Sequence, residues 1–152
     1  MKAAVLYGAQ DLRYTDFETP RINRDEILVR VKATGICGSD LPRVLGDGAH
    51  FYPIVLGHEF SGEVVEVGSA VNNLKVGDRI AGAPLIPCLK CSDCQHGWYS
   101  QCKNYSFIGS RVSGSWAEYL KMPACNGVKL PDGVTYEQGA LFEPATVALH
   151  GL

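Results

Sequence analysis

The chain has 152 residues, of which 46% are hydrophobic and 20% are charged, and 14 basic against 16 acidic residues give a formal net charge of −2. This balance, without a cluster of Lys and Arg, argues against nucleic acid or an anionic membrane as a partner. No apolar run approaches the roughly 20 residues of a membrane span, and the length suits a single domain with a hydrophobic core.

The first part of the sequence predicts three β-strands. Residues 1–7 form an apolar run, and residues 12–17 follow a turn-like segment, so the two are expected to pair. Residues 26–34 alternate between apolar and polar side chains, which is typical of a half-buried strand. This strand leads into a Gly-rich turn that contains Cys37.

The middle of the chain predicts further short strands at residues 62–67, 79–83, 116–121 and 127–130. Turns rich in Gly separate them, for example at Val76-Gly77-Asp78. Many short strands at close spacing indicate an all-β barrel or sandwich.

Four cysteines lie in one short loop with the spacing C-x2-C-x2-C-x7-C: Cys88, Cys91, Cys94 and Cys102. They can converge on one tetrahedral Zn²⁺, and a closed four-sulfur site leaves no open position for substrate, so this zinc is expected to be structural. Two local disulfides or an iron–sulfur cluster are the alternatives, but the fourth cysteine lies too far along the chain for a ferredoxin motif. Without an export signal, the cysteines favour metal ligation in the reducing cytoplasm.

The last part of the sequence predicts helical structure. Thr135 and Gln138 match a capping box, and apolar residues follow at helical spacing as far as Leu152. Pro144 is expected to be the first residue of a helix, with Glu143 directly before it. Because the apolar pattern continues to the last residue, we expect the chain to be part of a longer protein.

Candidate ligands for a second metal are scattered along the chain: Cys37, His58, Glu59 and Glu143. A catalytic zinc typically keeps three protein ligands and leaves one position open for water or substrate. Each residue alone has an ordinary alternative, such as a buried thiol, a surface His-Glu pair or a helix cap. Taken together, and beside a separate four-cysteine lobe, they favour a catalytic zinc site.

Three motifs and the four-cysteine lobe resemble the zinc-containing medium-chain dehydrogenase/reductase family, which includes the alcohol and polyol dehydrogenases. The motifs are Gly35-Ile36-Cys37-Gly38-Ser39-Asp40, Gly57-His58-Glu59-Phe60-Ser61-Gly62 and Val76-Gly77-Asp78-Arg79. The resemblance covers residues 1–152 and implies a mainly β, GroES-like, partly open barrel with short helices and a zinc lobe at residues 84–110. Stretches such as residues 37–43 and 107–111 further resemble relatives that act on polyol phosphates.

The resemblance implies a metal role for four residues outside the lobe. Cys37 and His58 match the ligands of the catalytic zinc, and Glu143 matches the position of the third ligand. Glu59 follows the zinc-binding histidine and in relatives either coordinates the metal or supports its ligands. The sequence does not decide which of the two carboxylates binds the metal.

Other residues are expected to act around this metal. Asp40 resembles the carboxylate that orients the zinc-binding histidine, and Ser39 matches the hydroxyl that passes the alcohol proton outward. In several relatives a histidine continues this relay, but here that position is Pro42. A sugar phosphate needs a cation, preferably a guanidinium, and three residues are candidates, with solvated surface charge as the alternative: Arg43, His50 and Arg111.

The implied activity is NAD-dependent oxidation of a secondary alcohol of a polyol or polyol phosphate, with one catalytic and one structural zinc. Such a zinc stabilises the alkoxide so that hydride can leave for the nicotinamide. No G-x-G-x-x-G motif follows a strand anywhere in the chain. Because the family carries this nucleotide-binding domain directly after the part matched here, the resemblance implies that this chain is the N-terminal part of an enzyme that forms a dimer or tetramer, and that it is inactive alone.

Two other functions stay open. One is a sorbitol-, butanediol- or threonine-type dehydrogenase of the same family. The other is a non-catalytic zinc-binding interaction module, for which one tightly held zinc per chain is expected instead of two.

Overall fold

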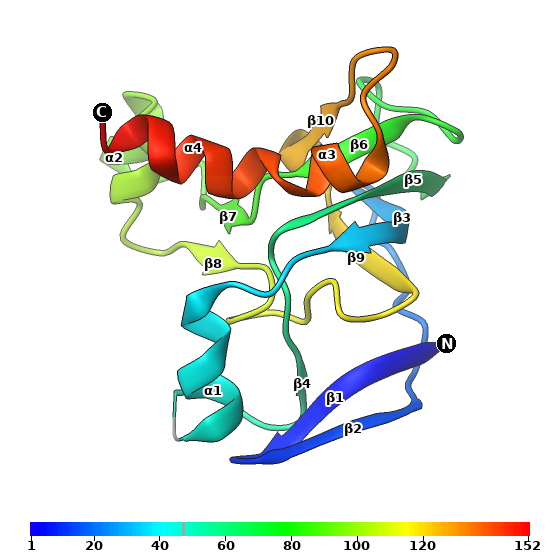
Figure 1. Cartoon of the computed structure of the whole chain (residues 1–152). Coiled ribbons are helices and arrows are strands. Elements are labelled where there is room, and N and C mark those ends of the chain that lie inside the picture. The colour runs from blue at the N-terminus through cyan, green and yellow to red at the C-terminus, as the bar shows by residue number, and fades with distance from the viewer. Residues whose placement is uncertain (47) are drawn as a thin grey trace.

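The computed structural model describes residues 1–46 and 48–152 and is mainly β, as the sequence predicts. It contains a five-stranded, a three-stranded and a two-stranded sheet, joined by short helices (Figure 1). No helix in these described ranges is long and apolar enough to cross a membrane.

The five-stranded sheet has the strand order β10–β6–β5–β3–β9, and every neighbouring pair is antiparallel. Within the described residues, its edge strands β10 and β9 do not pair with each other, so the sheet curls without closing and forms a partly open barrel. Its strands are β3 (Glu26–Thr34), β5 (Phe60–Val67), β6 (Arg79–Gly82), β9 (Tyr119–Pro123) and β10 (Gly127–Lys129). The strand predicted from residue 116 therefore begins at Tyr119.

Two smaller sheets complete the β-structure. In the first, β1 lies between β2 and β4, which confirms the predicted pairing of the first two strands. The other sheet joins β7 and β8 on either side of the four-cysteine loop. The strands are β1 (Lys2–Gly8), β2 (Asp11–Asp16), β4 (Ile54–Val55), β7 (Leu85–Ile86) and β8 (Ser106–Phe107). Strands of two residues are too short to show an alternating pattern, so the sequence did not predict them.

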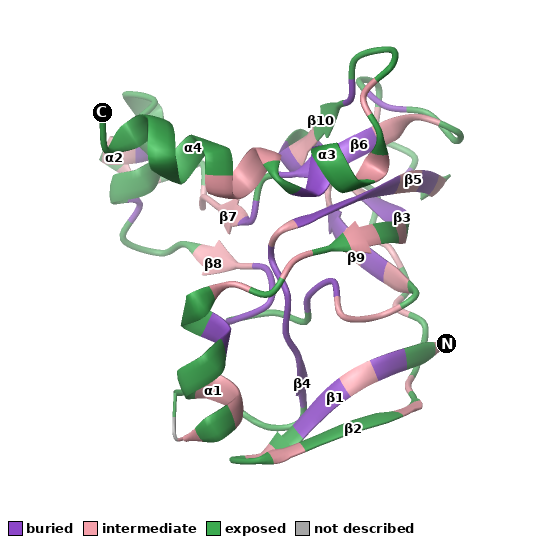
Figure 2. Cartoon of the chain, in the orientation of Figure 1, coloured by how far each residue is buried: buried purple, intermediate pink, exposed green. Residues whose placement is uncertain are grey.

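The main core is built around the neighbouring strands β3 and β5, and Figure 2 shows β5 as buried over much of its length. Ile27 and Val29 of β3 pack with Phe60 and Val64 of β5, and all four side chains are buried. Burying each such side chain stabilises the fold by about 1.5–3 kcal/mol. The core therefore fixes the two strands from which the candidate metal ligands extend.

Helix α3 (Tyr136–Ala140) begins with the predicted capping box. The Gln138 amide donates to Thr135 Oγ1 at 3.2 Å, and the Thr135 amide donates to Gln138 Oε1 at 2.9 Å. Helix α3 packs against β3, β5 and β6, so it covers one face of the sheet.

Helix α4 (Phe142–His150) follows α3 directly and shows that one prediction was wrong. Pro144 is the third residue of this helix instead of its first, and Glu143 lies inside the first turn. A proline is compatible with this position because the first amides of a helix have no partner within the helix.

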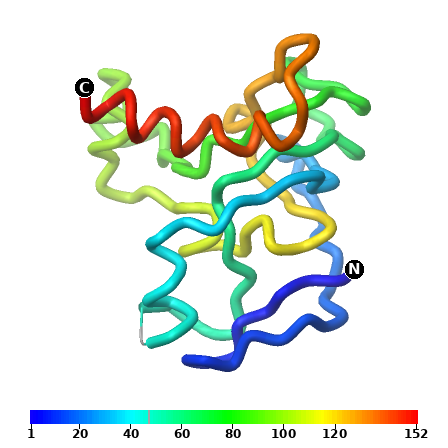
Figure 3. The backbone as a smooth tube through the Cα atoms, in the orientation of Figure 1, coloured from blue at the N-terminus to red at the C-terminus, as the bar shows by residue number. Residues whose placement is uncertain are grey.

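The remaining helices of the described residues are short. They are α1 (Leu41–Leu45), α2 (Ser92–Gln95) and the 3₁₀ turns η1 (Gly38–Asp40), η2 (Tyr99–Gln101) and η3 (Ala124–Asn126). The two termini of the chain lie far apart, at opposite sides of the molecule (Figure 3).

Candidate metal centres and the adjoining pocket

Three of the predicted ligands come together in space. One ligand atom each from Cys37, His58 and Glu59 lie within 4.8 Å of one another. Cys37 directly precedes η1, and the other two residues link β4 to β5. A thiolate, an imidazole and a carboxylate form the three-ligand donor set of a catalytic zinc with one open position. The chemistry of the donor set therefore fits a catalytic zinc.

Backbone contacts hold these segments together. The Gly35 amide donates to the Glu59 carbonyl at 2.7 Å, and Trp116 Nε1 donates to the Gly35 carbonyl at 3.0 Å. Gly57 has a φ of +92°, which favours glycine, and a side chain there would collide with the Trp116 indole. These contacts bring the turn after β3 against the turn before β5.

Asp40 is completely buried next to Cys37 and His58. Its Oδ2 accepts the Cys37 amide at 3.1 Å, and its Oδ1 lies 3.6 Å from His58 Nδ1. Among the described residues, neither Asp40 Oδ1 nor His58 Nδ1 has a hydrogen-bond partner, and Arg43 Nη1 lies 3.5 Å from the same Oδ1. Because Nδ1 faces the carboxylate, the opposite ring nitrogen is left for a metal, which is the geometry that the expected orienting role requires.

Glu143 lies near this group but is not part of it among the residues that the structure describes. Burial raises the pKa of its carboxyl group; the charge of His58 lowers that pKa and the charge of Glu59 raises it. Glu143 also lines a neighbouring cavity of about 380 Å³ together with Phe107. Of the two carboxylates that the sequence left undecided, Glu59 is thus the one placed beside Cys37 and His58.

The four cysteines of the loop also converge. Their sulfur atoms lie within 4.8 Å of one another, and they belong to Cys88, Cys91, Cys94 and Cys102. The Sγ atoms of Cys88 and Cys94 are 4.0 Å apart, as are those of Cys91 and Cys102. These distances are too long for disulfides and close to the roughly 3.8 Å between sulfurs that each bind one tetrahedral zinc at about 2.3 Å. The geometry is that of a structural zinc site.

The surroundings of two of these cysteines shift their thiol pKa values in opposite directions. The amides of Lys90 and Cys91 point at Cys88 Sγ and lower the pKa of Cys88 to about 6. Burial raises the pKa of Cys94 to about 12. A bound cation would stabilise the thiolate form of Cys94, which the apolar surroundings alone disfavour.

A polar pocket of about 240 Å³ adjoins the first metal group through His58. All three residues that the sequence proposed for phosphate binding line it, as does the predicted proton-relay residue Ser39. The full lining is Ser39, Arg43, His50, His58, Tyr105, Phe107, Ser110 and Arg111. The sequence analysis missed Tyr105, Phe107 and Ser110, although two of them belong to the stretch at residues 107–111.

Phe107 and Ser110 contact groups of the site directly. The Phe107 ring meets the His58 ring edge-on, with 5.6 Å between the ring centroids. Ser110 is buried, and its Oγ lies 3.5 Å from Arg43 Nη2.

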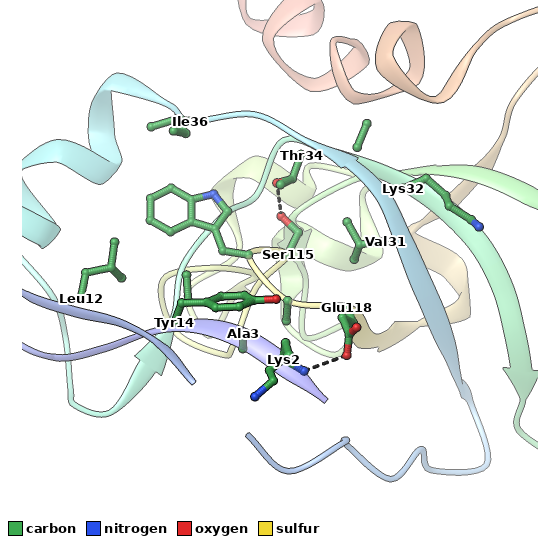
Figure 4. A pocket seen from close by; sticks show the side chains of 14 residues that line it. Lys2, Ala3, Leu12, Tyr14, Val31, Lys32, Thr34, Ile36, Ser115 and Glu118 are labelled. Atoms are coloured by element: carbon green, nitrogen blue, oxygen red, sulfur yellow. Dashed lines mark hydrogen bonds between the residues drawn. The ribbon is translucent and has the colours of Figure 1, made fainter. Parts of the chain in front are cut away.

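A wider cavity of about 590 Å³ lies elsewhere, between the strand pair β1–β2, the end of β3 and the segment around Trp116 (Figure 4). There, the hydroxyls of Thr34 and Ser115 are 2.7 Å apart, and the Lys2 amide donates to the Glu118 carboxylate at 2.7 Å. None of the residues that line this cavity is a predicted site residue. The smaller pocket beside His58 is therefore the one of the two that contains predicted site residues.

Comparison with known proteins agrees with this geometry. Residues 23–132 match the alcohol dehydrogenase GroES-like domain. The chain belongs to this family. Its sequence and fold are those of the GroES-like N-terminal domain found in zinc-dependent medium-chain dehydrogenases/reductases, as the motifs indicate.

Two of the curated relatives are named for a polyol or polyol-phosphate substrate. The chain is 49% identical over 151 residues to galactitol 1-phosphate 5-dehydrogenase of Escherichia coli K12, covering 99% of the chain and 44% of the relative. It is 39% identical over 155 residues to sorbitol dehydrogenase of Bacillus subtilis 168, covering 99% and 44%. The chain thus spans less than half the length of these curated relatives.

Solved structures share the fold. The crystal structure of galactitol-1-phosphate dehydrogenase from Escherichia coli superimposes with a TM-score of 0.95 at 47% identity, covering 99% of this chain and 44% of that one. A short chain alcohol dehydrogenase from Escherichia coli CFT073, complexed with NADH, gives a TM-score of 0.91 at 34% identity, covering 98% and 44%.

Proposed function

We propose that this chain supplies the catalytic domain of a zinc- and NAD-dependent dehydrogenase that oxidises a secondary alcohol of a polyol phosphate, with galactitol 1-phosphate as the first substrate to test. The observation that carries the proposal is the contact between a three-ligand metal group and a cationic pocket. His58 belongs to both, and Arg43 and Arg111 line the pocket. A polyol phosphate has matching ends: hydroxyls for a metal and an anion for guanidinium groups.

A zinc ion held by Cys37, His58 and Glu59 would act as a Lewis acid on the substrate hydroxyl and lower its pKa. Asp40 keeps this ligand set in place, because it binds the Cys37 amide and faces the His58 ring. Phe107 covers one edge of that ring and helps to exclude water from it.

Ser39 is the residue proposed to receive the substrate proton. It lines the pocket, and Arg43 Nη1 donates to its Oγ at 3.0 Å. This bond uses one lone pair of the hydroxyl, so the second lone pair can accept a proton while the hydroxyl hydrogen is passed to water. Ser39 is exposed, and with Pro42 at the next relay position we expect water to be the final acceptor.

Sorbitol oxidation is the second candidate, and the 39% identity to a sorbitol dehydrogenase favours it. The cationic lining of the pocket distinguishes the two, since an uncharged hexitol gains little from two guanidinium groups.

Two measurements test the proposal. Metal analysis of the 152-residue chain is expected to find two zinc ions, of which a chelator removes one easily; a single, tightly held zinc would instead support a non-catalytic zinc module. A full-length protein that carries this domain is then assayed for NAD reduction with galactitol 1-phosphate, sorbitol, 2,3-butanediol and threonine. A clear preference for an uncharged substrate would contradict the polyol-phosphate assignment.

A further inference from the structure

We infer that the two arginines of the pocket have different tasks. Arg111, together with His50, binds the phosphate of the substrate, whereas Arg43 is a positioning residue that fixes Ser39 and Asp40. The inference rests on the proposed function for the identity of the substrate. It divides between two side chains a role that the sequence assigned to all three cations alike.

The Arg43 guanidinium is already occupied by the protein. Its Nη1 donates to the Ser39 carbonyl at 2.6 Å and to Ser39 Oγ at 3.0 Å, and it lies 3.5 Å from Asp40 Oδ1. Its Nη2 reaches Ser110 Oγ at 3.5 Å, and its side chain is only 18% exposed. Its Nε is buried, and among the described residues it has no partner. Arg43 therefore has no open pair of donors to offer to a phosphate.

The positive charge of Arg43 is also compensated by the carboxylate of Asp40. Asp40 is completely buried and places Oδ1 between Arg43 and His58. An ion pair of this kind leaves little net positive charge for a ligand in the pocket. Removing Arg43 would leave a buried carboxylate without its counter-charge beside a proposed metal ligand, so the damage would fall on the metal site.

Arg111 is in the opposite situation. It is exposed, and its guanidinium lies over the Tyr105 ring at 4.5 Å from the centroid, with one bond of 3.4 Å to the Tyr105 hydroxyl. Stacking fixes the plane of a guanidinium while its edge donors stay free for a bidentate contact. In the described part of the chain, no acidic group lies within 4.0 Å of Arg111.

The composition of the pocket also favours phosphate binding by Arg111. None of its eight lining residues is acidic, and the exposed imidazole of His50, which lines the same pocket as Arg111, adds a further donor. A phosphate at this position meets an uncompensated guanidinium, while the carbinol end of the same molecule can reach the side of the pocket formed by His58. The phosphate end of the substrate is thus assigned to Arg111 and His50 instead of to Arg43.

Steady-state kinetics on a full-length protein that carries this domain separate the two tasks. Arg111→Ala is expected to raise the KM for galactitol 1-phosphate by about tenfold to a hundredfold, the usual effect of losing a charge-assisted bidentate contact. The same variant should change the KM for galactitol far less, and Arg111→Lys should recover part of the loss. Arg43→Ala should lower kcat for both substrates.

Arg30→Ala is the matched control, because Arg30 is also exposed and also lies over a tyrosine ring, that of Tyr119, at 5.6 Å. It lies outside the pocket, so neither substrate should be affected. For Arg43→Ala, the visible spectrum of the cobalt(II)-substituted domain is expected to change, which a role confined to phosphate binding would not cause. Equal losses on both substrates in Arg111→Ala, or a selective loss of the phosphorylated substrate in Arg43→Ala, would overturn the inference.

A binding measurement keeps the inference testable if the proposed enzyme activity fails. In the zinc-loaded 152-residue chain, inorganic phosphate is expected to shift the NMR signal of the Arg111 Nε–H group in a saturable manner. The shift should survive in Arg30→Ala and in Arg43→Lys. An Arg111 signal that does not respond to phosphate would overturn the assignment, whatever the substrate of the enzyme.

Discussion

Gly35 and Glu59 are in direct contact across the junction of β3 and β5, and the contact depends on the absence of a side chain. The Gly35 amide donates to the Glu59 carbonyl at 2.7 Å, and a Cβ atom on Gly35 would collide with the Glu59 carboxylate. Glycine at this position therefore lets the carboxylate occupy the place where it meets Cys37 and His58.

Replacing Gly35 by Ala should displace this carboxylate and weaken the proposed catalytic zinc. We expect Gly35→Ala to hold close to one zinc ion per chain after dialysis, where the unmodified chain holds two. Gly38→Ala is the matched control, because a Cβ on Gly38 meets nothing within 4 Å. If Gly35→Ala keeps both zinc ions as tightly as Gly38→Ala does, Glu59 does not ligate the metal.

Asp40→Asn should weaken the same zinc without removing a ligand. The amide keeps the size of the carboxylate but loses the charge that faces His58 and Arg43. Losing such a partner typically costs about tenfold to a hundredfold in metal affinity, which competition with a chelator can measure. Asp16→Asn, which removes an exposed ion pair with Lys2, should leave the affinity unchanged. An unchanged affinity in Asp40→Asn would show that Asp40 serves only to bind the Cys37 amide.

The sequence predicted the strands of the main sheet well because their patterns are local. The alternation of residues 26–34 places Ile27 and Val29 in the core, and the capping box at Thr135 forms as expected. Elements of two residues, such as β4, carry no periodic signal and were missed. Pro144 was misplaced because a proline fits any position in the first turn of a helix, so it does not define the first residue.

For the candidate site too, the sequence predicted the features that depend on local spacing and missed those that depend on tertiary structure. The spacing of the four cysteines is local, and their convergence follows from it. By contrast, the choice between Glu59 and Glu143 depends on where α4 lies relative to the β4–β5 turn, and that is a tertiary relationship. The different surroundings of Arg43 and Arg111 were hidden for the same reason, since Ser110 and Asp40 are brought to Arg43 only by folding.

Asp78 provides a test of stability against pH. Its Oδ2 accepts the Lys75 amide at 2.9 Å and lies 3.0 Å from Lys129 Nζ. Burial raises the pKa of Asp78, but these two contacts outweigh burial and hold it below its ordinary value of 3.8. Because the folded state prefers the ionised form, the stabilisation is present above pH 3.8 and is lost as the pH falls through the lowered value.

Asp78→Ala is therefore expected to lower the free energy of unfolding by about 1 kcal/mol at pH 7. Urea unfolding at several pH values should show the difference from the unmodified chain shrinking below pH 3.8. Asp132→Ala removes an exposed carboxylate from another turn and should cost much less. A difference that stays constant down to the acid-unfolding limit would contradict a role for the ionised carboxylate.

Removal of the lobe zinc should affect the loop and spare the sheet. Asn126 Nδ2 donates to the carbonyls of Ala83 and Leu85, both at 2.7 Å, so the base of the loop is anchored independently of any metal. Cys94→Ser is expected to lose one zinc ion per chain and to become sensitive to protease between residues 88 and 102, while its far-ultraviolet circular dichroism stays the same. Cys125→Ser changes an exposed cysteine outside the cluster and should behave like the unmodified chain. If Cys94→Ser instead unfolds as a whole, the lobe zinc contributes to the stability of the entire domain, and the Asn126 anchor is not sufficient to hold the loop base.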